Sequence, residues 1–177
     1  MATCDDCRLP IERSLSTVKK RVLCDPCSSL YDLDSSIRMR PVERDDLELL
    51  LAWRSIPEIY RHFRVQDGPL NWDEHVTWYE SRSDSRYDFL IRYEKRQVGV
   101  VSIDSDDEVG IYLGDFSVHG HGIATAALEW ICDRFADRTP FTAEVHENNE
   151  PSKNLFKNCG FKKNTTNGGW IRYIYES

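Results

Sequence analysis

The chain has 177 residues, of which 40% are hydrophobic and 30% are charged, and its formal net charge is −7. This length suits one domain of ordinary size with a small appendage, and the negative charge argues against bulk binding of nucleic acid. No apolar run approaches the roughly 20 residues of a membrane span, and residues 1–10 lack the apolar core of a signal peptide. We therefore expect a soluble, cytoplasmic protein that neither enters a membrane nor binds nucleic acid.

The N-terminal segment carries two pairs of cysteines with the CxxC spacing: Cys4, Cys7, Cys24 and Cys27. In a reducing compartment such pairs are more often metal ligands than disulfides, and their separation by residues 8–23 is typical of a zinc site. Two thiolates on a tight turn can both reach one tetrahedral zinc ion at about 2.3 Å. So short a segment cannot bury a sufficient core, and the ion would supply the missing stability. We predict a structural Zn²⁺ ribbon over residues 1–29, followed by a Ser- and Asp-rich linker over residues 30–36.

The segment after the linker combines one alternating run with helical patterns. Residues 37–42 alternate in polarity and predict a strand. Acids followed by leucines predict a helix that begins near Arg44, and Pro57 begins a second, shorter helix. A third helix is predicted to begin with Asn71 as its N-cap and Glu74 as the partner in a capping box.

The hydrophobic period then changes to two, which indicates strands. Beside an antiparallel pair at the C-terminus, strands are predicted over residues 87–93, 97–103, 108–114 and 141–147. One helix is predicted after the glycines of residues 117–122, and a second ends at Gly160. Cys132 and Cys159 lie in these helical patterns, where packing is the simpler role. The order predicts a mixed α/β fold built on one sheet.

The loop "SVHGHG" at residues 117–122 combines two histidines with two glycines. His119 and His121 make a weak metal site, because no third ligand stands at motif spacing from them. Gly120 and Gly122, placed before a helix N-terminus, indicate an anion site built from backbone amides. A glycine pair that only relieves backbone strain explains the pattern equally well. Dinucleotide-binding loops require a glycine at Thr125, and P-loops require a lysine, so neither of these motifs is present.

The stretch "HGHGIA" resembles the pyrophosphate loop of the GNAT family of N-acetyltransferases, Arg/Gln-x-x-Gly-x-Gly/Ala. His119 stands at the Arg/Gln position, Gly122 at the glycine and Ala124 at the final small residue. The resemblance extends over residues 37–175, through a first strand and helix and a C-terminal Asn-x-x-Ser motif. It is closest to the branch of ribosomal-protein and amino-sugar-nucleotide acetyltransferases. It implies a mixed, mostly antiparallel sheet flanked by helices, as one domain over residues 37–177.

The resemblance also implies acetyl-CoA as the cosubstrate. Its pantetheine arm is expected along the strand that ends at Leu113, with Asn149 and Phe156 as further cofactor-binding residues. The pyrophosphate is expected on the loop and the first helical turn, at His119, Gly120, His121, Gly122, Ile123, Ala124 and Thr125. Because His119 replaces the usual Arg/Gln, the phosphate contact of that side chain remains open.

Acetyl transfer requires a base for the amine and a proton for the departing thiolate. Glu144 is the predicted base, because it matches the position of the glutamate base in the ribosomal-protein acetyltransferases. A strand glutamate that faces solvent or pairs with a basic residue is the alternative, and His146 is a second candidate base. Phe156 stands where many relatives carry a tyrosine, and it has no hydroxyl to donate. Ser152 is therefore predicted as a second catalytic residue, with an N-terminal helix cap as its alternative role.

Aromatic and basic side chains of the first helices occupy the region where relatives bind the acceptor: Trp53, Arg54, Tyr60, His62, Phe63 and Arg64. They predict a pocket for an anionic or sugar-like acceptor, or else core aromatics beside solvated arginines. We predict an N-acetyltransferase for a primary amine of a small molecule, such as an amino-sugar nucleotide, or of a protein N-terminus. The alternative is a non-catalytic adaptor that binds acetyl-CoA and engages a protein partner through the zinc ribbon.

Overall fold

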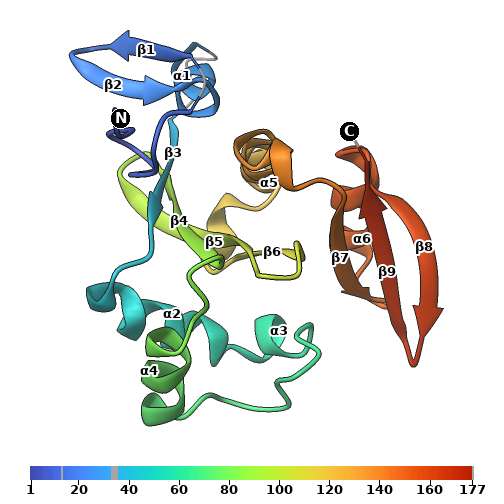
Figure 1. The fold of residues 1–177 in the computed structure, drawn as a ribbon. Helices are drawn as coiled ribbons and strands as arrows, with labels where there is room; N and C mark the ends of the chain where they lie inside the picture. The colour runs from blue at the N-terminus through green and yellow to red at the C-terminus, as the bar shows by residue number, and fades with distance from the viewer. Residues whose placement is uncertain (13, 33–35, 177) are drawn as a thin grey trace.

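The computed structural model describes residues 1–12, 14–32 and 36–176. It contains a four-stranded sheet, a three-stranded sheet and a two-stranded hairpin (Figure 1). The four-stranded sheet has the order β3-β4-β5-β6, with β3 (Ile37–Pro41), β4 (Tyr87–Tyr93), β5 (Arg96–Ile103) and β6 (Val109–Leu113). The three-stranded sheet has the order β7-β9-β8, with β7 (Phe141–His146), β9 (Trp170–Tyr175) and β8 (Lys162–Asn167). Strand pairs within both sheets are antiparallel.

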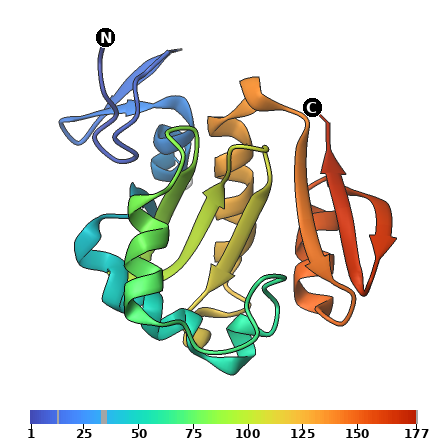
Figure 2. The same ribbon diagram turned by 60° about the horizontal axis from the view of Figure 1, so that its bottom comes forward.

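The predicted mixed α/β fold of mostly antiparallel strands flanked by helices is confirmed, but the strands form two sheets and not one. Strands β6 and β7 are joined at one end only, where Glu108 and Thr142 form a parallel bridge and Thr142 N donates to Asp107 O at 3.0 Å. Beyond this bridge the two strands diverge, and Figure 2 shows the three-stranded sheet standing apart from the four-stranded one. A hydrophobic period of two predicts strands and their faces, but it does not specify neighbours.

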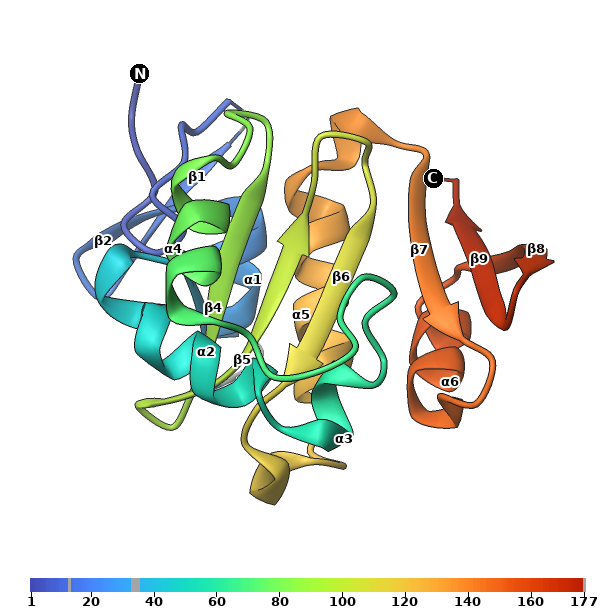
Figure 3. The same ribbon diagram turned by 90° about the horizontal axis from the view of Figure 1, so that it is seen from below.

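Helices cover both faces of the four-stranded sheet. The helices after residue 42 are α2 (Leu47–Arg54), α3 (Pro57–Tyr60), α4 (Trp72–Glu80), α5 (Ile123–Arg134) and α6 (Glu150–Asn158), with 3₁₀ turns η1 (Arg44–Asp46), η2 (Phe116–Val118) and η3 (Ala136–Arg138). Helix α6 packs against the three-stranded sheet, where Phe156 stacks on Tyr173. Helix α5 lies on one face and α2 and α4 lie on the other (Figure 3). In β4, Phe89 and Ile91 belong to the core beneath α5, whereas Leu90 packs beneath α2. Because alternate residues point to opposite faces, a strand covered on both sides is apolar throughout.

The predicted helix boundaries are largely confirmed. The first helix begins as the 3₁₀ turn η1 at Arg44 and continues as α2. Asn71 is the N-cap of α4, but its side chain accepts a hydrogen bond from Asp73 N at 2.8 Å and not from Glu74. Gly160 follows α6 with φ +90°, a left-handed conformation that glycine adopts without strain.

The N-terminal segment, residues 1–12 and 14–32, is called the cysteine module below. It consists of a hairpin of β1 (Leu15–Val18) and β2 (Arg21–Cys24) followed by α1 (Asp25–Asp32). The predicted ribbon boundary at residue 29 lies inside α1, and residues 33–35 of the predicted linker lie outside the described residues. Leu23 and Leu30 share one buried cluster with α5 and the sheet, so the module packs onto the domain. Within the described ranges, the structure has no helix that is both long and apolar enough to span a membrane.

Candidate active site and metal centre

Residues 114–122, called the glycine loop below, connect β6 to α5. A Cβ on Gly114 would lie 2.1 Å from the Trp53 ring, so only glycine allows the loop to begin against α2. The Asp115 carboxylate then accepts hydrogen bonds from the Ser117 amide at 3.0 Å and the Ser117 hydroxyl at 2.6 Å. Gly120 and Gly122 have φ of +81° and +74°, which explains why glycine is favoured at both positions.

The glycine loop ends at an N-terminus suited to an anion. Gly122 is the N-cap of α5, and its carbonyl accepts the first helical hydrogen bond from Ala126 N at 3.0 Å. The amides of Ile123, Ala124 and Thr125 therefore have no partner within the helix. A Cβ at either glycine would meet nothing within 4 Å, so the backbone is accessible from the outside. The exposed amides and the helix dipole together attract an anion such as phosphate.

The two histidines of the glycine loop do not face a common metal. Nδ1 of His121 lies 3.0 Å from Val118 O and 3.1 Å from His119 O, so this ring folds back onto the loop. The His119 side chain is exposed, with its ring edge-to-face on Phe116 at 5.1 Å between centroids. Of the described His, Cys, Asp and Glu side chains, those that form a potential metal site are the four N-terminal cysteines. The backbone is thus the part of the loop arranged for binding.

A pair of carboxylates lies where β6 and β7 begin to diverge. Glu108 and Thr142 are bridged, and Glu144 is two residues further along β7, so both glutamates project from the same face. The Glu144 side chain is 17% exposed, and its Oε2 accepts a hydrogen bond from Arg64 Nη1 at 2.5 Å. Burial, aided by the charges of Glu144 and Asp104, raises the pKa of Glu108. A half-buried acid beside a second carboxylate is typical of a site that exchanges protons.

Glu108 is a candidate site residue that no sequence pattern indicates. It was placed only at the start of a strand, because its neighbour Thr142 is distant in sequence and no motif connects the two. The alternating pattern of residues 108–114 already placed Glu108, Gly110 and Tyr112 on one face. It gave no indication of which groups would lie opposite them.

A family model described as an acetyltransferase (GNAT) domain matches residues 36–162. The chain belongs to the GNAT family. It is 37% identical over 155 residues to an uncharacterized protein of Methanocaldococcus jannaschii, a match that covers 81% of this chain and 31% of the relative. The chain therefore spans about a third of that relative's length.

Solved structures share the GNAT fold. A domain from Methanocaldococcus jannaschii is 36% identical, with a TM-score of 0.74, and the match covers 80% of this chain and 98% of that domain. Spermidine N-acetyltransferase from Vibrio cholerae, solved with CoA and spermine, is 17% identical with a TM-score of 0.67. That match covers 78% of this chain and 93% of the spermidine enzyme, and at this identity it shows the fold alone.

Helix α6 of the GNAT domain carries the remaining predicted residues of the C-terminal motif. Asn149 is the N-cap, and its side chain accepts a hydrogen bond from Ser152 N at 3.3 Å. The alternative role of Ser152 as the helix cap is therefore wrong. Phe156 is 4% exposed and packs edge-to-face against Phe161, with 5.0 Å between ring centroids. Its side chain forms part of the core between α6 and the three-stranded sheet.

The predicted acceptor residues separate into two groups. Trp53 is 8% exposed and packs beneath Gly114, as the core interpretation expects. Arg54 and Phe63 line a small cavity, whereas Arg64 reaches Glu144 from the segment after α3. The structure thus brings Arg54, Phe63 and Arg64 toward the side of β6 and β7 that carries Glu108 and Glu144.

The four cysteines of the cysteine module lie outside the range matched by the GNAT model. They are buried, their Sγ atoms all lie within 4.8 Å of one another, and those of Cys7 and Cys24 are 3.9 Å apart. A disulfide would require about 2.05 Å between sulfurs. Tetrahedral Zn–S bonds of about 2.3 Å place sulfurs about 3.8 Å apart. The cluster therefore fits a four-coordinate zinc ion.

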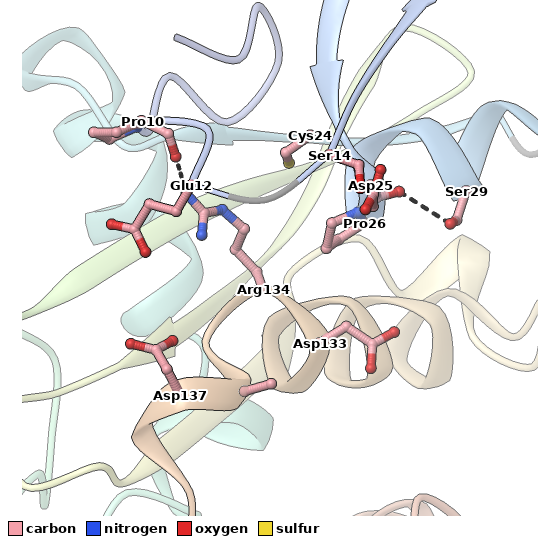
Figure 4. A pocket seen from close by; sticks show the side chains of 11 residues that line it. Pro10, Glu12, Ser14, Cys24, Asp25, Pro26, Ser29, Asp133, Arg134 and Asp137 are labelled. Carbon is pink, nitrogen blue, oxygen red and sulfur yellow. Dashed lines mark hydrogen bonds between the residues drawn. The ribbon is translucent and has the colours of Figure 1, made fainter. Parts of the chain in front are cut away.

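A pocket of about 230 Å³ separates the cysteine module from the C-terminal end of α5 (Figure 4). Arg134 crosses it from α5 and donates a hydrogen bond from Nη2 to Pro10 O at 2.8 Å. Cys24 lies in its wall, and the other polar lining residues are mostly acidic: Glu12, Asp25, Asp133 and Asp137. Cys24 belongs both to the wall of this pocket and to the cysteine cluster. We therefore expect a change in the geometry of the cysteine site to alter the contact between Arg134 and Pro10.

Proposed function

We propose that the chain is an acetyl-CoA-dependent N-acetyltransferase that acts on a primary amine. The observation that carries this proposal is the divergence of β6 and β7 next to the glycine loop. Past the Glu108–Thr142 bridge, β6 presents backbone groups to which the amides of a pantetheine arm can pair, down to Leu113. The amides of residues 119–125 would receive the pyrophosphate. The thioester would then lie between the two strands, on the side of the carboxylates.

Glu108 and Glu144 are the candidates for the base. A general base is most effective when its pKa lies near the working pH, and burial raises the pKa of Glu108 in that direction. Glu144 instead forms an ion pair with Arg64 and is 17% exposed, so its carboxylate lies where an incoming ammonium group could contact it. We infer that Glu108 removes the proton and that Glu144 orients the amine. Ser152 remains the candidate donor to the thiolate, since Phe156 has no hydroxyl.

Two matched variants test this division. With acetyl-CoA and a panel of amines, Glu108→Gln is expected to lower kcat by about 10²-fold or more. The parent rate should rise with pH through the raised pKa of Glu108, and this rise should be absent from the variant. Glu144→Gln should mainly raise the KM of the amine. The exposed Glu147, varied to Gln, is the control, and release of free thiol is the measurement.

If Glu108→Gln keeps the full rate and pH profile while Glu144→Gln loses both, the base is Glu144. Such a result would contradict the division of roles but not the reaction. Tight binding of acetyl-CoA without thiol release for any amine would instead favour the adaptor function. The one observation that favours the adaptor is Phe156, which is buried and supplies no proton.

The cysteine cluster is proposed to hold a structural zinc ion. The site has four thiolate donors and no further ligand position is needed, which distinguishes structural from catalytic zinc. Asp5 supports the first cysteine turn, because its amide donates to Val22 O at 2.8 Å and its carboxylate accepts from Val22 N at 2.7 Å. The ion would supply folding stability to a segment whose own core is small.

A further inference from the structure

A second cavity lies beside the carboxylates, beneath α2 and α4. Its volume is about 60 Å³, and its lining includes Arg54, Phe63, Trp78, Ser102, Gly110 and Tyr112. Gly110 and Tyr112 follow Glu108 at intervals of two along β6, so all three face the same side of the sheet. The cavity therefore adjoins the candidate catalytic face and contains several positions the size of a water molecule.

Arg54 is a half-buried cation in this cavity, and among the described residues its charge has no ionic partner. Its Nη2 donates to the neutral side chain of Gln66 at 3.0 Å, and its Nε is buried without a hydrogen-bond partner. The guanidinium lies 4.7 Å from the centre of the Phe63 ring and 5.8 Å from that of Trp78, which hold it in place. Among the described side chains, no carboxylate forms an ion pair with Arg54. Buried charges are normally paired, so this one lacks its counterpart.

The surroundings increase the positive charge. Asp88 lines the cavity, and it already accepts hydrogen bonds from Arg82 Nη1 at 2.8 Å and Arg86 Nη2 at 3.0 Å. The guanidinium groups of Arg54, Arg82 and Arg86 thus surround the single carboxylate of Asp88. Tyr112 adds a buried hydroxyl without a hydrogen-bond partner, on a ring fixed edge-to-face by Phe63 at 5.7 Å. A buried tyrosine hydroxyl usually finds a partner. Arg54 Nε and the Tyr112 hydroxyl are therefore two donors without partners in a positively charged cavity. Such donors are complementary to the negatively charged oxygen atoms of a carboxylate or phosphate.

We propose that this cavity, called the Arg54 cavity, binds an anionic group of the amine acceptor, a carboxylate or a phosphate. This inference rests on the proposed acetyl transfer and specifies its substrate class. Strand geometry places Glu108 about 7 Å from Gly110 and about 13 Å from Tyr112 along β6. An acceptor whose ammonium group lies at Glu108 and Glu144 therefore places its anionic group in the cavity if the ammonium and the anionic group are about 7–13 Å apart. The opposite charges of the two sites fix the orientation of such a molecule.

The first test compares matched acceptors. One series pairs amino acids with their uncharged amides, and a second pairs amino sugars with their phosphates and nucleotide diphosphates, which distinguishes carboxylate from phosphate. In the parent protein the anionic members should have kcat/KM at least about tenfold above their neutral counterparts, as expected for a hydrogen bond to a charged group. Arg54→Gln should abolish this preference, and Arg54→Lys should restore it in part. An equal preference in the parent and in Arg54→Gln overturns the proposal.

Tyr112→Phe removes a hydroxyl that has no partner, so it should fold normally and still reduce the preference for anions. Tyr173→Phe is the matched control, because the Tyr173 hydroxyl is also buried without a partner but lies outside the cavity. The exposed Arg44, which pairs with Glu80, provides the control for arginine as Arg44→Gln. Both controls should keep the parent preference. A loss of preference in Tyr173→Phe equal to that in Tyr112→Phe contradicts a specific role for the cavity.

Binding separates this inference from the proposed reaction. Calorimetry with the same anionic and neutral compounds, on protein saturated with CoA, measures recognition without turnover. Tighter binding of the anionic members that depends on Arg54 supports the cavity even if no thiol is released, in which case only the proposed reaction fails. Thiol release together with equal binding of both members overturns the cavity and leaves the reaction intact.

Discussion

The two ends of α5 meet two regions that are built in opposite ways. At the C-terminal end, Arg134 contacts the cysteine module, where four side chains converge within 4.8 Å. At the N-terminal end, the glycine loop presents backbone amides while the His121 ring folds back onto the loop. The proposed metal site is formed by the side chains of four cysteines. The proposed anion site is formed by backbone amides, which Gly120 and Gly122 leave uncovered because they have no side chains.

This difference determines how each region responds to substitution. A site made of side chains loses its ligand when one donor is removed, because no other group replaces a thiolate. A site made of backbone amides, as proposed for the glycine loop, should tolerate changes of side chain such as His119 in place of Arg/Gln. It is sensitive instead to changes in φ, because left-handed residues hold the amides in position. Variants of the two regions should therefore give separable effects.

The largest effect is expected from Cys4→Ser combined with Cys27→Ser. Structural zinc contributes about 10 kcal/mol or more to the folding of small zinc domains, so loss of two ligands should abolish metal binding and unfold the cysteine module. Metal content by mass spectrometry should fall to background, and Tm should decrease, because the module shares a buried cluster with α5. Cys159→Ser is the control, since this cysteine lies outside the cluster.

Below the Tm of the double variant, acetyl-CoA binding should persist, since the glycine loop makes no use of the cysteines. Unchanged metal content in the double variant would contradict the metal site. Complete loss of acetyl-CoA binding by a protein that is still folded would show that the two ends of α5 are coupled.

The same difference explains how much could be predicted from the sequence. The cysteine pairs and the glycines before α5 are local patterns; in the structure the four cysteines converge and Gly122 is the N-cap of α5. The Glu108–Thr142 bridge and the Arg54 cavity depend on contacts between distant segments, which local patterns do not specify. The end of α1, from residue 30, falls within the predicted linker because that stretch is rich in Ser and Asp. Leu30 packs into the common core and stabilises a helix that its composition does not favour.

Gly122→Ala should affect the other end of α5. With φ of +74°, an alanine costs about 1–2 kcal/mol, and its Cβ would project into open space beside the amides proposed to bind phosphate. The Kd of acetyl-CoA, measured by calorimetry, should rise about tenfold, while metal content stays at the parent value. Gly68→Ala is the matched control, because Gly68 is equally open but is not left-handed. Equal affinity in Gly122→Ala and Gly68→Ala would contradict the assignment of the anion site to these amides.

The smallest effect concerns Glu108, whose site belongs to neither end of α5. Burial raises the pKa of this carboxyl in the folded protein, so the folded state holds the proton more tightly than the unfolded state. The free energy of unfolding therefore falls as pH rises from the unfolded-state pKa, about 4.3, through the folded-state pKa, and it stays lower above both. Glu108→Gln cannot ionise, so it should be more stable than the parent at neutral pH, with the difference vanishing in acid.

Denaturant titrations over a pH series measure this difference, with the exposed Glu147→Gln as a control that should show no such trend. A Glu108→Gln variant that is less stable at every pH would mean that the attraction of Arg172 and Arg64 for the carboxylate outweighs its burial. Greater stability combined with a lower rate of acetyl transfer would show that this carboxylate is kept at a cost to folding. That combination is expected of a catalytic base and not of a structural ion pair.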